Sequence, residues 1–145
     1  VVLWVSGCSH CCKDCHNPIT WDPNGGVTFD ESAKKELFAE LEKTYISGIT
    51  FSGGDPLHSK NKKDVEELAK EIKNKYPLKT IWLYTGSTWE GIRHSSIMQY
   101  LDVCVDGEFE CDKQSKQLHW RGSSNQRVID VQKSLESGET VLYCQ

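Results

Sequence analysis

Four of the seven cysteines of this 145-residue chain fall within eight consecutive positions, at Cys8, Cys11, Cys12 and Cys15. A disulfide framework spreads its cysteines along the chain to staple distant loops, so this crowding indicates metal binding instead. An apolar, β-branched run at residues 1–6 precedes the group, and Gly7 ends that run. The pattern predicts a strand that leads directly into a metal-binding loop.

Three of these cysteines have the spacing Cys8-x-x-x-Cys12-x-x-Cys15, which places three thiolates on one compact loop. An electron-transfer [4Fe–4S] cluster normally has four cysteine ligands, and structural zinc takes four cysteine or histidine ligands. A set of three therefore predicts a cluster in which one iron is open to another molecule. Cys11 is expected to be a neighbour of this site rather than a ligand.

A zinc site is the alternative for the same loop. Its fourth ligand would come from His10, Cys11 or His16, which lie within reach in the sequence. Zinc sites usually draw paired ligands from two separate loops, however, and no second cysteine pair follows downstream. The sequence therefore favours iron and sulfide over zinc, and it assigns no role to Cys111 or Cys144.

Strand-like apolar segments alternate with amphipathic, helix-like segments along the rest of the chain. We expect strands at residues 49–51, 80–84 and 101–105, and helices at residues 28–45, 65–72 and 88–98, with Thr28 opening the first helix in a capping box. Residues 128–135 suggest a short helix and residues 140–143 a closing strand. Trp4, Trp82 and Cys104 are expected to be packing residues within strands.

This alternation predicts a single α/β domain over residues 1–145, with a parallel sheet joined by crossover helices. The sheet would be either a partial, open barrel or an open twisted sheet. Because the chain begins at Val1, inside an expected strand, we also expect that a preceding segment is missing from it.

Four unusual segments each follow directly on an expected strand. They are the cysteine group, residues 52–55 (Ser-Gly-Gly-Asp), residues 85–86 (Thr-Gly) and residues 106–107 (Asp-Gly). Parallel α/β folds place their sites at the carboxyl ends of the strands. We therefore expect the four segments to converge on one site.

The composition bounds the partners and the location of the protein. The formal charge of −4 and the pI of about 5.7 offer no broad cationic surface, so no nucleic-acid or membrane partner is expected. No apolar run approaches the roughly 20 residues that cross a bilayer, and no secretory signal precedes the cysteines. A cytoplasmic enzyme is the expectation.

The chain resembles the radical S-adenosylmethionine (SAM) superfamily, since three cysteines with this spacing follow the first strand and a Gly-Gly-acid-Pro stretch follows the second. Within that superfamily it is similar to the family of activating proteins of anaerobic (class III) ribonucleoside-triphosphate reductases. The segments that carry the resemblance are residues 7–17, 52–57, 84–86, 105–107 and 121–127. The resemblance spans nearly the whole chain and implies a partial, open TIM-like barrel of the radical SAM type.

This resemblance implies an enzyme whose reduced [4Fe–4S] cluster binds SAM at the open iron and cleaves it to methionine and a 5′-deoxyadenosyl radical. The radical would take a hydrogen atom from one glycine of the large reductase subunit, and an external one-electron donor such as flavodoxin would reduce the cluster. Two alternatives remain. One is a radical SAM enzyme for another glycyl radical enzyme or a small molecule, and the other is a non-catalytic zinc-binding module.

The resemblance also implies where SAM would bind. The expected cofactor-binding residues are Ser52, Gly53, Gly54, Asp55, Thr85, Asp106, Ser123 and Asn125. The first four would receive the methionine amino group, mainly through the backbone. The next two would lie near the methionine carboxylate, with a bound monovalent cation that the Cys104 carbonyl helps to ligate, and the last two would contact the cofactor from the opposite end of the chain.

Plain structural roles remain open for the same residues. Gly-Gly-Asp-Pro is often an ordinary turn, an aspartate at a strand end often caps the next turn, and arginines among small polar residues often form a solvated turn. His10 is expected to hydrogen-bond beside the cluster rather than to ligate it, and Asn17 to steady the loop. His16 or Trp21 would face the adenine, because Asp14 stands where many superfamily members carry an aromatic residue.

Overall fold

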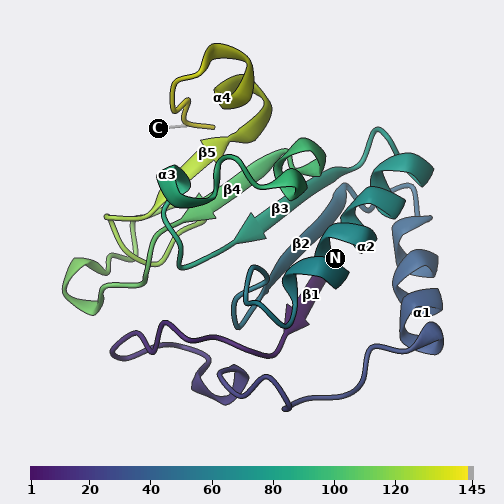
Figure 1. Cartoon of the computed structure of the whole chain (residues 1–145), viewed down its shortest axis with the longest axis horizontal. Helices are drawn as coiled ribbons and strands as arrows, with labels where there is room; N and C mark the ends of the chain where they lie inside the picture. The colour runs from purple at the N-terminus through teal and green to yellow at the C-terminus, as the bar shows by residue number, and fades with distance from the viewer. Residues whose placement is uncertain (144–145) are drawn as a thin grey trace.

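The structure is a computed structural model of the chain, and it describes residues 1–143. One sheet contains all five strands in sequential order, β1 (Val2–Val5), β2 (Gly48–Gly53), β3 (Thr80–Tyr84), β4 (Val103–Asp106) and β5 (Arg127–Asp130). Strands β1 to β4 are parallel to their neighbours, whereas β5 is antiparallel to β4 (Figure 1). The fold is therefore the predicted mixed α/β class, with one antiparallel strand that was not predicted.

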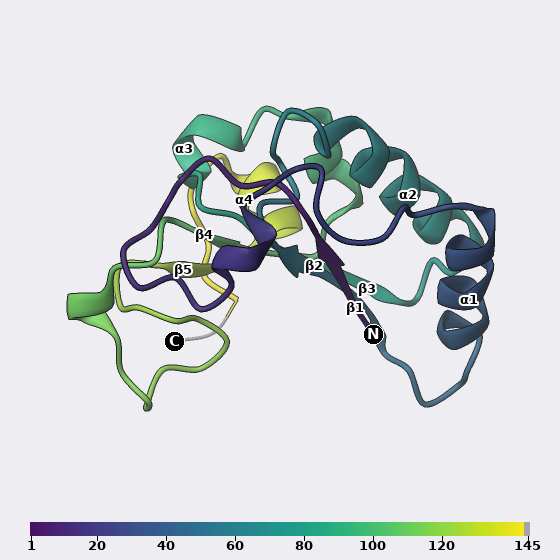
Figure 2. The ribbon, with the colours of Figure 1, turned by 90° about the horizontal axis from the view of Figure 1, so that it is seen from below.

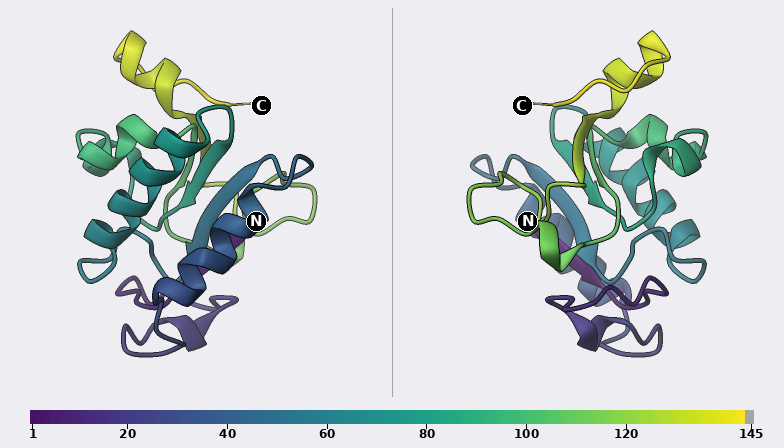
Figure 3. Two further views of the ribbon diagram at one scale, coloured as in Figure 1. Left: turned by 90° about the vertical axis from the view of Figure 1, so that its right-hand side faces the viewer. Right: turned by 90° about the vertical axis from the view of Figure 1, so that its left-hand side faces the viewer.

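Helices cover one face of this sheet. The helices are α1 (Glu31–Leu41), α2 (Lys62–Lys75), α3 (Trp89–Ile92) and α4 (Val131–Ser137), with 3₁₀ turns η1 (Pro18–Thr20), η2 (Ser96–Tyr100) and η3 (Cys111–Lys113). Val65, Leu68, Ala69 and Ile72 recur along α2 and are all buried, as their helical spacing predicts. Figure 3 shows α2 on one side of the sheet and the segment after β4 on the other.

Two expected helices begin or end at other residues than predicted. Asp30, and not Thr28, caps α1, since its carboxylate accepts a hydrogen bond from the Ala33 amide at 2.9 Å. The helix expected at residues 88–98 divides into α3 and η2, with a turn at residues 93–94 between them. Gly91 and the serines at the junction are weak helix formers, which accounts for the break.

The helix expected at residues 128–135 is wrong in its first half. Val128 and Ile129 are β-branched and pair with Val105 and Cys104, which extends the sheet by the antiparallel strand β5. The helix α4 begins only after Asp130, whose carboxylate accepts from the Lys133 amide at 3.1 Å. The closing strand expected at residues 140–143 is reduced to a single bridge between Leu142 and Ile129.

The face of the sheet without helices carries a second, smaller apolar group. Trp82 packs there against the valines of β4 and β5, with Trp120 at 5.7 Å between ring centroids. Its predicted packing role is confirmed, as is that of Cys104, which is fully buried. The prediction for Trp4 is wrong: this side chain is 61% exposed, because it points away from the face that the helices cover, whereas its neighbours Leu3 and Val5 pack against the core.

None of the helices within residues 1–143 has both the length and the apolar character needed to cross a membrane.

Candidate functional site

The cysteine loop (residues 7–17) is held against the turn that follows β2. Gly54 and Asp55 donate backbone hydrogen bonds to the carbonyls of Val5 and Gly7, each at 2.7 Å, so the pairing of β1 with β2 continues beyond both strands. Gly7 itself has a φ of +115°, a conformation that glycine adopts readily. The loop therefore leaves the sheet at its carboxyl edge, as predicted, and Figure 2 shows it passing toward the segment after β4.

The cysteines of the loop differ in exposure. Cys8, Cys12 and Cys15 are half-buried, whereas Cys11 is exposed and has a φ of +52°. The Asn17 amide donates to the sulfur of Cys15 at 3.4 Å, and the Cys15 amide donates to the Cys12 carbonyl. Within residues 1–143, no three Cys, His, Asp or Glu side chains already form a metal-ligating group.

Two of the half-buried thiols have perturbed acidity. Burial raises the pKa of Cys8, with further upward contributions from the charges of Asp55, Cys12 and Cys15, against a hydrogen bond from the His10 backbone. Burial also raises the pKa of Cys12, and the charge of Glu108 adds to it. Because metals bind thiolates, loading of this loop should release protons and be favoured by a rise in pH.

The Gly-Gly turn (residues 52–55) comprises the last two residues of β2 and the two that follow, and it ends in the buried carboxylate of Asp55. Oδ2 of Asp55 meets Nε2 of His10 at 2.6 Å, Oγ1 of Thr85 at 3.0 Å and the Gly86 amide at 3.1 Å. Oδ1 accepts from the Leu57 amide at 2.9 Å. The Thr85 hydroxyl, itself buried, also accepts from the Ser87 amide. These contacts bring the ends of β2 and β3 together, as predicted.

His10 links this carboxylate to a residue that the sequence did not single out. Its Nδ1 lies 2.9 Å from Oε1 of Glu108, which follows the end of β4. Burial lowers the pKa of His10, but its hydrogen bonds to the carboxylates of Glu108 and Asp55 outweigh this effect and the net pKa is raised. An imidazole that faces a carboxylate at each nitrogen donates to both only as the cation. The only sequence signal for Glu108 was its place directly after a strand end.

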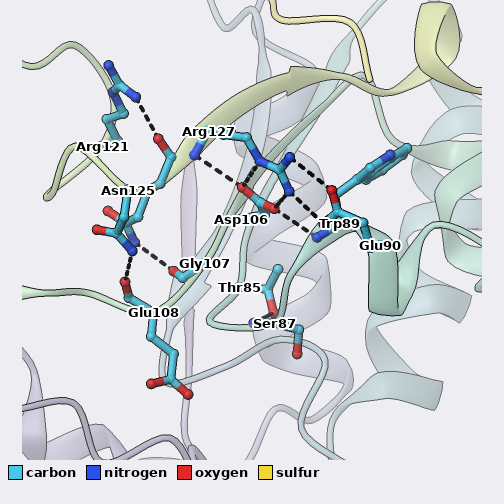
Figure 4. Close-up of polar contacts among 11 residues, drawn as sticks. Thr85, Ser87, Trp89, Glu90, Asp106, Gly107, Glu108, Arg121, Asn125 and Arg127 are labelled. Atoms are coloured by element: carbon cyan, nitrogen blue, oxygen red, sulfur yellow. Dashed lines mark hydrogen bonds and ion pairs between the residues drawn. The ribbon is translucent and has the colours of Figure 1, made fainter. Parts of the chain in front are cut away.

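The buried carboxylate of Asp106 forms an ion pair with the guanidinium group of Arg127. Its carboxylate accepts from Nη2 of Arg127 at 2.6 Å, from Nε of Arg127 at 3.2 Å and from the Trp89 amide at 2.8 Å (Figure 4). Arg127 also forms a two-pronged ion pair with Glu90, and this lowers the pKa of Glu90 to about 2. Asp106 therefore has a structural role, but it binds the first amide of the preceding helix α3 and Arg127 rather than the turn that follows it.

The two residues expected from the far end of the chain have different environments. Ser123 is fully buried, and its hydroxyl accepts from the Glu110 amide at 3.1 Å. Asn125 donates through Nδ2 to the Glu108 carbonyl at 2.8 Å (Figure 4). Its Oδ1 is the one buried side-chain polar atom of the described residues that has no hydrogen-bond partner. Ser123 thus bonds within the loop, whereas Asn125 keeps an acceptor without a partner among residues 1–143.

Gly54 tests how closely the Gly-Gly turn must approach the cysteine loop. A Cβ at this position would lie 2.6 Å from the Gly7 carbonyl oxygen and 2.8 Å from that of Thr20. We expect Gly54→Ala to lower the free energy of unfolding of the iron-free protein by about 1–3 kcal/mol, measured with urea.

The matched control is Gly91→Ala in α3, where the nearest atom to the new Cβ is 3.6 Å away. We expect this substitution to change stability by less than about 1 kcal/mol, and in the favourable direction. Equal effects of the two substitutions would show that the two backbones have room to separate.

Comparison with known proteins gives a consistent result. A family model described as a 4Fe-4S single cluster domain matches residues 1–129. The chain is 43% identical over 128 residues to the anaerobic ribonucleoside-triphosphate reductase-activating protein of Enterobacteria phage T4, a match that covers 88% of this chain and 81% of the phage protein. The proteins of that name from Pasteurella multocida and Escherichia coli K12 are each 39% identical, over 87% of this chain and 84% of theirs. No solved structure matches.

Proposed function

The chain belongs to the family of anaerobic ribonucleoside-triphosphate reductase-activating proteins, and on that premise we propose that it activates such a reductase through a [4Fe–4S] cluster held by Cys8, Cys12 and Cys15. One observation carries the proposal: the loop with these three half-buried thiols leaves the carboxyl edge of a parallel sheet beside the Gly-Gly turn. Three thiolates leave one iron of such a cluster without a protein ligand.

When bound, the cluster would supply one electron that breaks the sulfonium–C5′ bond of SAM, giving methionine and a 5′-deoxyadenosyl radical that takes a hydrogen atom from a glycine of the reductase. An external one-electron donor such as flavodoxin would provide the electron. The sequential order of the four parallel strands is that of a (β/α) barrel, and we propose that they form the partial barrel of the radical SAM type.

The Gly-Gly turn is proposed to hold the methionine amino group through its backbone. Asp55 already accepts from four donors, three on Oδ2 and one on Oδ1. Its part, with Thr85, is therefore to fix the turn, while Ser52, Gly53 and Gly54 offer their carbonyl groups. The absence of side chains at the two glycines lets a ligand approach that backbone closely.

Asn125 is proposed to contact the adenosyl moiety through Oδ1. This oxygen is buried and has no partner among residues 1–143, and a buried acceptor without a donor costs free energy. A hydroxyl or amino group of SAM would satisfy it. Asp106 would lie near SAM without binding it directly. The Arg127 guanidinium neutralises the charge of Asp106, at the place where a separate bound cation had been expected.

His10 is not available as the fourth ligand that a zinc site would need. Both ring nitrogens of His10 are bonded to carboxylates, so neither is free to bind a metal ion. The match of residues 1–129 to a 4Fe-4S domain also supports iron and sulfide. The names of the relatives support a reductase rather than a small molecule as the target.

The test is anaerobic reconstitution with iron and sulfide, followed by electron paramagnetic resonance of the reduced protein with and without SAM. We expect a [4Fe–4S]⁺ signal that changes when SAM is added, because SAM would bind the iron without a protein ligand. Tight, stoichiometric zinc with no such signal would overturn the proposal. So would a cluster signal that ignores SAM at any concentration.

A further inference from the structure

The ring of His10 lies where the segments after all four parallel strands meet. His10 belongs to the loop after β1, its Nε2 contacts Asp55 after β2, and its Nδ1 contacts Glu108 after β4. The segment after β3 contributes Gly86, whose amide donates to the same Asp55 oxygen. Within residues 1–143, no other side chain of the cysteine loop hydrogen-bonds to residues that follow both β2 and β4.

Gly86 provides the space for this ring. A Cβ at position 86 would lie 2.6 Å from Cδ2 and 2.7 Å from Nε2 of His10, closer than side-chain atoms approach one another. The imidazole thus packs directly on the backbone of residue 86 while its two nitrogens bond to carboxylates on either side. The position of the ring is therefore fixed by packing as well as by hydrogen bonds.

We propose that His10 is a positioning residue, which joins the cysteine loop to the ends of β2, β3 and β4 and so fixes where a cluster would face the Gly-Gly turn. This inference rests on the proposed function. His10 stands two residues from Cys8 and two from Cys12, so an anchored ring limits where the backbone of both cysteines can lie. Cys11 and Asp14 have left-handed backbone conformations in the same loop, which makes an external anchor more important.

The experiment compares His10→Ala with the wild-type protein after anaerobic reconstitution. The change in the electron paramagnetic resonance signal is titrated with SAM, and amide hydrogen exchange of residues 8–17 is measured on the iron-free proteins. We expect the SAM concentration at half-change to rise at least about tenfold, as is usual when a residue that orients metal ligands is removed. The exchange of the loop amides should become faster.

His94→Ala is the matched control, because His94 is an exposed histidine outside the site. It should titrate as the wild type does. Gly86→Ala keeps the imidazole but places a methyl group where the ring lies, so it should also raise the SAM concentration at half-change. Equal half-change concentrations for the wild type, His10→Ala and Gly86→Ala would overturn the inference while leaving the proposed function intact.

His10→Ala could fail to take up iron, or the wild-type signal could fail to respond to SAM, and each outcome has its own consequence. If His10→Ala takes up no iron, Glu108→Ala provides the test. Within residues 1–143 its side chain hydrogen-bonds to the cysteine loop only at His10, and its removal should raise the half-change concentration about threefold. An unchanged value for Glu108→Ala would then overturn the inference. A wild-type signal that ignores SAM would overturn the proposed function and this inference with it.

Discussion

Replacement of Cys12 by alanine should abolish the [4Fe–4S]⁺ signal of the reconstituted protein, whereas replacement of Cys11 should leave it intact. The two residues are neighbours in the sequence, but Cys12 is half-buried beside Cys15 and Cys11 is exposed. Two thiolates hold a four-iron cluster poorly, so bound iron should fall from about four to fewer than about one atom per chain in the Cys12 variant. Iron and sulfide analysis measures this directly.

The Cys11 variant is a close control because alanine and cysteine meet the same strain at a φ of +52°. Urea unfolding of both iron-free variants checks that neither substitution disrupts the fold. Loss of the cluster in the Cys11 variant, with retention in the Cys12 variant, would contradict the ligand assignment. The ligands would then be Cys8, Cys11 and Cys15.

The convergence of four strand ends was predictable because it follows from topology alone. Parallel strands joined by crossovers share one carboxyl edge, so segments that follow them must meet there whatever their sequence separation. Asp55 accepts hydrogen bonds from Thr85 and Gly86, about 30 residues away, and these bonds confirm that the segments after β2 and β3 meet. Periodicity likewise predicted α2, whose buried residues recur at a strict helical spacing.

The contacts made by particular side chains were not predictable in the same way. His10 and Glu108 are 98 residues apart, and nothing local in either segment specifies the other. The run at Val128 and Ile129 was also ambiguous, since a short apolar run fits a strand or a buried helix equally well until its neighbour is known. Trp4 was also misjudged, because its exposure depends on which face of the sheet the helices cover.

Arg127 illustrates how one such contact dominates stability. Its guanidinium bonds at once to Asp106, whose side chain is 2% exposed, and to Glu90, whose side chain is 61% exposed. A buried carboxylate that loses its partner keeps the cost of desolvation without the attraction that offset it, whereas an exposed one is solvated again by water. The two halves of the same ion-pair network should therefore have very different importance.

Arg127→Met should accordingly lower the free energy of unfolding of the iron-free protein by about 3–5 kcal/mol. Glu90→Gln, which removes the other carboxylate from the same guanidinium, should cost less than about 1 kcal/mol. Urea unfolding at neutral pH measures both. Adding Asp106→Asn to the Arg127 variant should recover part of the loss, because the amide removes the buried charge and its oxygen still accepts from the Trp89 amide. Equal costs for the two single variants, or no recovery in the double variant, would mean that the buried charge of Asp106 is not what makes Arg127 important.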